Sequence, residues 1–84
     1  MTTPDDADET DVVQTAADAA EDVIFSRFDR SRVSDFDVTA SYEDGEFEID
    51  VYLDVPEDRD AAKQVAEDAV LAARNAVDDL LASE

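Results

Sequence analysis

Hydrophobic and polar residues alternate strictly on both sides of Asp44-Gly45. The alternating apolar residues are Phe36, Val38, Ala40 and Tyr42 before this dipeptide, and Phe47, Ile49, Val51, Leu53 and Val55 after it. Asp-Gly between two such runs is typical of a two-residue hairpin turn, in which both central residues have positive φ. The sequence therefore predicts antiparallel strands at about 35–43 and 46–55. A two-residue loop sets Tyr42 opposite Phe47, so that the apolar residues of both strands share one face.

The segment before the hairpin has helical rather than alternating periodicity. Its apolar residues recur at three- and four-residue spacing: Val13, Ala16, Ala17, Ala20, Val23, Ile24 and Phe28. This spacing predicts an amphipathic helix from Glu9 to about Phe28, which either Asp8 or Thr10 could cap at its N-terminus. Arg27 and Arg30, near its end, suit the negative end of the helix dipole.

The segment after the hairpin is also periodic. Its apolar stripe consists of Ala62, Val65, Ala66, Ala69, Val70, Ala73, Ala76, Val77, Leu80 and Leu81. Pro56 ends the second strand and suits the first turn of a helix, where its missing N–H costs nothing. We therefore expect a second helix from about residue 57 to residue 82, with a stripe of alanines that allows close approach to its neighbours.

These elements give an α+β fold with the order α-β-β-α, an antiparallel β-hairpin with two helices packed on its apolar face. Residues 9–84 form a single domain in this interpretation, and residues 1–8, with Pro4 and several acids, form a disordered acidic leader. A hairpin alone has two open edges and is marginally stable. The fold class itself therefore suggests self-association or a partner strand.

Charge changes this picture, because the chain has 25 acidic residues against 6 basic ones and a formal net charge of −19. The acids alternate with apolar residues instead of forming a low-complexity run, so the chain is expected to fold. The expected hairpin register sets Glu43 opposite Glu46 and Asp35 opposite Asp54, pairs that repel in dilute buffer. At about 1 M salt the Debye length is only about 3 Å, and such repulsion is small. We interpret the composition as that of a halophile's protein.

The residue types present exclude several kinds of chemistry. The chain has no cysteine and no histidine, so it lacks thiol nucleophiles, the usual general base and the commonest metal ligand. The acids have no EF-hand spacing, and we expect no catalytic residue, no metal, no cofactor and no small-molecule substrate. The sequence shows no long apolar run and no signal-peptide pattern, so we expect a cytoplasmic protein without membrane contact.

Four residues stand out as candidate contacts with a partner or an anion. Arg27, Arg30 and Arg32 lie within six residues of an acidic chain, and the planar guanidinium group suits phosphate. The structural alternative is that these arginines complement a helix C-terminus and pair with nearby acids. Tyr52 is the one large aromatic residue on the polar face of the second strand, where it is either a contact residue or an ordinary exposed side chain.

Several segments together resemble a known family. They are Ile24-Phe25-Ser26-Arg27, Val33-Ser34-Asp35-Phe36-Asp37-Val38, Tyr42-Glu43-Asp44-Gly45 and Ile49-Asp50-Val51-Tyr52-Leu53-Asp54. This pattern is similar to that of the small archaeal family known as domain of unknown function 3194, over nearly the whole chain after the leader. Genes of that family often lie near those for the prefoldin beta subunit and for the Pcc-type small subunit of the KEOPS complex, which makes threonylcarbamoyladenosine in tRNA.

The resemblance implies a non-catalytic role. Pcc-type subunits are dimerising proteins with a similar order of elements, although they carry an additional strand before the first helix. The resemblance therefore implies an accessory or dimerising subunit of KEOPS, a distant paralogue of the Pcc-type subunit that forms a homodimer or a heterodimer with it and meets tRNA only indirectly. Two alternatives stay open: a self-associating small domain, and a weak RNA- or anion-binding module that uses the segment from Arg27 to Arg32.

Overall fold

The computed structural model describes residues 9–82, which form two helices and one hairpin. The elements are helix α1 (Glu9–Arg27), a short 3-10 turn η1 (Arg30–Arg32), strands β1 (Asp35–Glu43) and β2 (Glu46–Asp54), and helix α2 (Arg59–Ala82). This order confirms the predicted α-β-β-α fold. The predicted leader, residues 1–8, lies outside the described residues.

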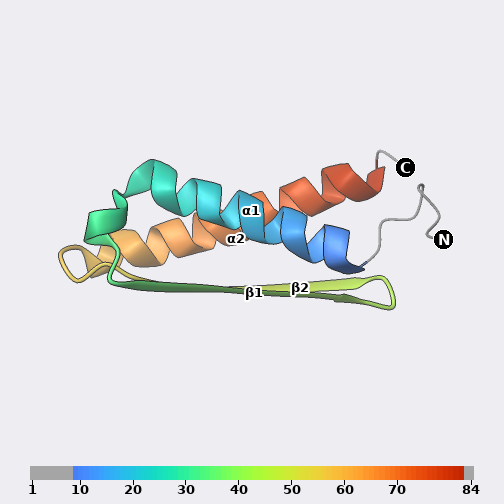
Figure 1. Cartoon of the computed structure of the whole chain (residues 1–84), viewed down its shortest axis with the longest axis horizontal. Coiled ribbons are helices and arrows are strands. Elements are labelled where there is room, and N and C mark those ends of the chain that lie inside the picture. Colours follow the sequence, from blue (N-terminus) through green and yellow to red (C-terminus); the bar gives the residue numbers. More distant parts are fainter. Residues whose placement is uncertain (1–8, 83–84) are drawn as a thin grey trace.

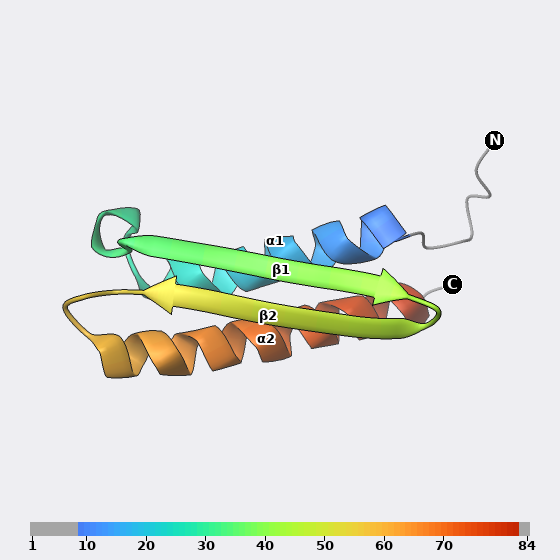
Figure 2. The ribbon, with the colours of Figure 1, turned by 90° about the horizontal axis from the view of Figure 1, so that it is seen from below.

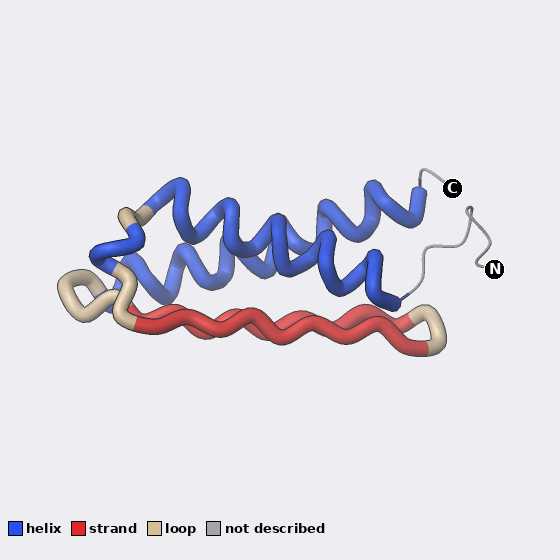
Figure 3. The backbone as a smooth tube through the Cα atoms, in the orientation of Figure 1, coloured by secondary structure: helices blue, strands red, loops and turns tan. Residues whose placement is uncertain are grey.

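The described elements form two layers. Helices α1 and α2 lie side by side and antiparallel, and both cover the same face of the two-stranded sheet (Figures 1 and 3). Seen from the sheet side, α1 runs along β1 and α2 runs along β2 (Figure 2). The hairpin turn lies at one end of the molecule, and η1 and the connection from β2 to α2 lie at the other (Figure 1). No second layer covers the outer face of the sheet in the part of the chain that the structure describes.

The hairpin has the register that the sequence predicts. Tyr42 pairs with Phe47, and the pairing continues without a slip to Asp35 opposite Asp54. Asp44 and Gly45 have φ values of 53° and 81°, the positive values that a type I′ turn requires. Glycine reaches this region without strain, and aspartate tolerates it better than most residues do. The Asp-Gly dipeptide therefore fixes which side chains of both strands face the helices.

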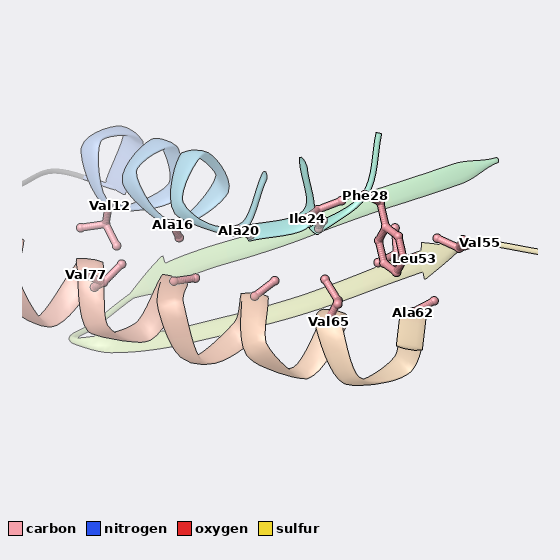
Figure 4. Close-up of a cluster of buried hydrophobic side chains, with 12 residues drawn as sticks. Val12, Ala16, Ala20, Ile24, Phe28, Leu53, Val55, Ala62, Val65 and Val77 are labelled. Atoms are coloured by element: carbon pink, nitrogen blue, oxygen red, sulfur yellow. The ribbon is translucent and has the colours of Figure 1, made fainter. Parts of the chain in front are cut away.

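The core lies between the two helices and the inner face of the sheet (Figure 4). Its buried residues are Val12, Ala16, Ala20, Ile24 and Phe28 from α1 and the residue after it, Leu53 and Val55 from β2 and its end, and Ala62, Val65, Ala69, Ala73 and Val77 from α2. Three of the five buried residues of α2 are alanines, in line with the predicted alanine-rich face of that helix. The predicted stripe of α1 omitted Val12, which is fully buried, and included Val13, Ala17 and Val23, which are only half-buried.

The helix starts also differ from the sequence expectation. Thr10 lies inside α1 and so does not cap it, and the alternative cap, Asp8, lies outside the described residues. Pro56 lies in a turn before α2, which begins at Arg59. The N-terminal cap is Asp58, whose Oδ1 accepts a hydrogen bond of 3.1 Å from the backbone N–H of Ala61. A side-chain acceptor at this position pairs with one of the N–H groups that have no partner within the helix at its start.

Replacing the cap should measurably destabilise the domain. We expect Asp58→Ala to lower the free energy of unfolding by about 1 kcal/mol, because the Ala61 N–H loses its acceptor. Asp58→Asn is the matched control, since asparagine caps about as well as aspartate and also removes the charge. Urea denaturation of both variants at one salt concentration measures the difference. Equal losses in the two variants would show that charge, and not the cap, matters at this position.

Candidate functional site

The outer face of the sheet is acidic and uncovered. Its side chains are Asp35, Asp37, Thr39, Ser41 and Glu43 on β1, and Glu46, Glu48, Asp50, Tyr52 and Asp54 on β2. The pairs Glu43–Glu46 and Asp35–Asp54 stand opposite each other, as the register predicts. Within residues 9–82 no group of three or more acidic side chains is arranged to hold a metal ion. This face therefore presents mainly negative charge to its surroundings.

The inner face of the sheet is only partly covered by the helices. Phe36, Val38, Ala40, Tyr42, Phe47, Ile49 and Val51 pack against the core but remain partly exposed. Two strands form the entire sheet of the described chain, so each strand has one edge without a neighbour. Exposed edges that carry apolar side chains are sites at which another strand can pair. The sheet edges are thus the candidate interaction sites that the fold creates.

Arg27 lies in the last turn of α1 and reaches across to the other helix. Its Nη2 atom lies 3.3 Å from Oδ2 of Asp68 on α2. Both side chains are partly exposed, so the ion pair contributes little to stability but orients the guanidinium group toward α2. This geometry supports the structural interpretation of Arg27.

The other two arginines lie in η1, beyond the end of α1. The Arg30 guanidinium stacks on the Phe25 ring, with its carbon 4.6 Å from the ring centroid. The Arg32 guanidinium lies 5.4 Å from the centroid of Phe28, and its Nε donates a hydrogen bond of 3.1 Å to Oε1 of Glu57. Each arginine of this segment therefore has a partner within the chain, and the three guanidinium groups do not converge on one point.

Tyr52 is 55% exposed and lies opposite Asp37 on the outer face of the sheet. It also lines a groove of about 390 Å³ between the open edge of β2 and the start of α2. The groove is further lined by Val51, Leu53, Asp54, Val55, Arg59, Asp60, Ala62, Lys63 and Ala66. The exposed ring therefore lies beside an open, partly apolar groove.

Three further basic residues lie on α2 beside strand β2, and they were not among the residues that the sequence pattern singled out. Arg59 and Lys63 line the groove beside Tyr52, and Arg74 lines a second groove with Phe47 and Ile49 from the same strand. On a helix with 100° per residue these three positions fall on one flank of α2. A helical projection of the charges, in addition to the apolar stripe, would have found this flank.

In the described chain, neither helix is long and apolar enough to cross a membrane.

An uncharacterised protein of Natronomonas pharaonis is 48% identical over 81 residues, a match that covers 93% of this chain and 96% of the relative. No solved structure matches this chain. The model of the family described as "Protein of unknown function (DUF3194)" matches residues 3–80, so the chain belongs to the DUF3194 family.

Proposed function

We propose that this protein is a non-catalytic interaction subunit that works by binding another protein through its sheet. The observation that carries the proposal is the two-stranded sheet, which has two open edges and partly exposed apolar side chains on its inner face. Isolated hairpins gain stability from additional strands, and strand addition gives affinity through main-chain hydrogen bonds. The unpaired strand edges are therefore the feature that supports this proposed function.

The first partner to test is a Pcc-type small subunit of KEOPS. The α-β-β-α order resembles that of those subunits, and in this proposal the chain is an accessory subunit of tRNA threonylcarbamoyladenosine synthesis. The cytoplasmic location and the halophilic adaptation belong to the same proposal, and the 25 acidic residues support the latter. The similar protein of Natronomonas pharaonis makes an extract of that organism a suitable source of partners.

Binding of RNA or another anion by the segment from Arg27 to Arg32 is the less favoured alternative. Asp68 and Glu57 already pair with two of its arginines. A formal net charge of −19 also repels phosphate, on which nucleic-acid affinity mainly depends.

Affinity purification tests the proposal. The tagged protein, expressed in the native host, is recovered from extract at about 2 M KCl, where exposed charges are strongly screened. We expect a stoichiometric protein partner that remains after nuclease treatment. Recovery of tRNA alone, lost on nuclease treatment, would favour the anion-binding alternative, and recovery of no partner would contradict the interaction proposal.

A further inference from the structure

Five of the six bases of this acidic chain gather at one end of the molecule. The fold brings residues 27–35 and 54–63 together at the end that contains η1 and the connection from β2 to α2 (Figure 1). We call these two segments the η1 end. They carry five bases and six acids, whereas the rest of the described chain carries fifteen acids and a single base, Arg74. The η1 end is therefore the region of the molecule where bases and acids nearly balance.

Three of the five bases at the η1 end have no acid partner. Arg27 and Arg32 each pair with an acid, but Arg30, Arg59 and Lys63 form no ion pair within residues 9–82. Arg59 and Lys63 share their groove with two acidic side chains. Arg30 differs from them because an aromatic ring holds its guanidinium group.

Stacking positions the donors of Arg30 without satisfying them. The guanidinium carbon lies 4.6 Å from the centroid of the Phe25 ring, and the residue is exposed. A ring covers one face of a guanidinium group, whereas the N–H donors lie in the plane of the group and stay free for an acceptor. The acceptor that matches this planar fork best is a carboxylate.

A groove of about 240 Å³ lies beside Arg30, at the start of β1. Phe25, Val33 and Phe36 supply its apolar lining, and the two rings meet edge to face with centroids 5.2 Å apart. Its volume is below the roughly 300 to 1,000 Å³ of small-molecule sites, so it suits one apolar side chain of a partner. Asp35, on the outer face of the sheet, also lines the groove, so a carboxylate of the partner fits on the Arg30 side.

A protein segment fits the η1 end better than RNA does. Binding of single-stranded RNA depends on aromatic side chains that stack on bases. Arg30 covers the Phe25 ring and Phe28 is only 6% exposed, so neither ring is open to a base. Contacts to phosphates also need several free basic side chains, and Arg27 and Arg32 are already paired.

A second copy of this chain is a poor occupant. Its most acidic projection is the hairpin turn, which lies at the opposite end of the molecule (Figure 1). A contact between opposite ends does not close on itself and would repeat into a fibre. The occupant is thus a different protein.

We propose that the η1 end binds an acidic segment of a different protein, which places an apolar side chain in the groove between Phe25 and Phe36 and a neighbouring carboxylate against Arg30. This inference rests on the proposed interaction function and adds the surface and the chemistry of the partner. It locates the contact at the start of the β1 edge, where the groove lies.

Two short capped peptides test the inference. The first has a leucine between two glutamates, and the second has glutamines in place of the glutamates, so that only the charge differs. Each is titrated into the full-length ¹⁵N-labelled protein at about 1 M KCl, where a Debye length of about 3 Å leaves contact pairs but removes long-range repulsion by the acidic surface. We expect the glutamate peptide to bind about threefold more tightly, the scale of one exposed ion pair, and to shift the amides of Phe25, Arg30 and Phe36.

Two matched variants separate Arg30 from general charge. Arg30→Gln should abolish the preference for the glutamate peptide, because it removes the stacked guanidinium group. Arg74→Gln makes the same change of charge outside the η1 end and should preserve the preference. Equal binding of both peptides to the natural chain, a preference that survives Arg30→Gln or is lost equally in Arg74→Gln, or no shift at millimolar peptide would overturn the inference.

Two further titrations identify other occupants. If a single-stranded oligouridylate shifts the same amides more strongly than the glutamate peptide does, RNA is the occupant and the inference is overturned. Concentration-dependent shifts of both Arg30 and Asp44 without peptide would identify a second copy and also overturn it. If Arg30→Gln recovers a stoichiometric partner from extract as well as the natural chain does, the interaction function stands on another surface and the inference is overturned.

Discussion

Thermal stability should rise steeply with salt, by about 10 °C or more between about 0.1 M and 2 M KCl. The cause is self-repulsion among 25 acidic residues with only 6 basic ones. Part of this repulsion acts between neighbouring side chains, because Glu43 faces Glu46 and Asp35 faces Asp54 across the hairpin. For a domain of this size, 1 kcal/mol corresponds to roughly 4 to 8 °C, so relief of a few such pairs accounts for the shift. Circular dichroism melts over the salt series measure it.

A charge variant separates screening of this repulsion from general effects of salt on the hydrophobic core. Glu46→Lys turns the repelling pair with Glu43 into an attractive one, so it should raise the melting temperature at low salt and reduce its dependence on KCl. Glu46→Gln removes the repulsion without adding attraction and should fall between the two. A melting temperature that stays flat across the series would contradict the halophilic interpretation.

Truncating the largest fully buried side chain should remove much of the domain's stability. Ile24 is completely buried between the helices and the sheet. We expect Ile24→Ala to lower the free energy of unfolding by about 3 kcal/mol, through lost apolar burial and the cavity left behind. A domain of this size has a total stability of roughly 5 to 10 kcal/mol, so the variant should unfold at a much lower urea concentration.

Leu71 provides the matched control for that substitution. Its side chain is 60% exposed on α2, so Leu71→Ala removes a similar apolar group from a site in contact with water. We expect a change of less than about 0.5 kcal/mol. Similar losses at Ile24 and Leu71 would mean that the core does not lie between the helices and the sheet.

The hairpin could be predicted from the sequence almost residue by residue. Asp44-Gly45 admits a two-residue turn, and a slip by one residue would turn the acids of both strands toward the helices. Local turn chemistry and burial thus favour the same register. The pairings from Glu43–Glu46 to Asp35–Asp54 follow from that agreement.

The sequence predicted both helices, but not which residue of each pair faces the core or where the second helix begins. Val12 and Val13 are equally apolar neighbours in an alanine-rich segment, so periodicity alone could not decide which of them faces the core. At the second helix, Pro56 was the predicted start signal, whereas the helix begins after Asp58, whose Oδ1 accepts a hydrogen bond from the Ala61 N–H. The 3-10 turn Arg30–Arg32 has no periodic signature, because it is too short to have one.

The candidate site was the least predictable part. The cluster of arginines is visible in the sequence, but the pairing of Arg27 with Asp68 joins residues 41 positions apart and depends on how the helices align. The grooves along the strand edges depend on which helix lies beside which strand. That arrangement brings Ala62 and Ala66 to β2, and Phe25 to β1, as only the three-dimensional fold shows.

The most direct test of the central claim, that this chain works in contact with another protein, is its native mass in the cell. Extract of the native host at about 2 M KCl, a concentration that screens non-specific charge contacts, is fractionated by size and probed for the untagged protein. We expect the protein to elute in a complex larger than the same purified chain alone, and the difference to persist after nuclease treatment. Elution of the cellular protein at the same position as the purified chain alone would contradict it.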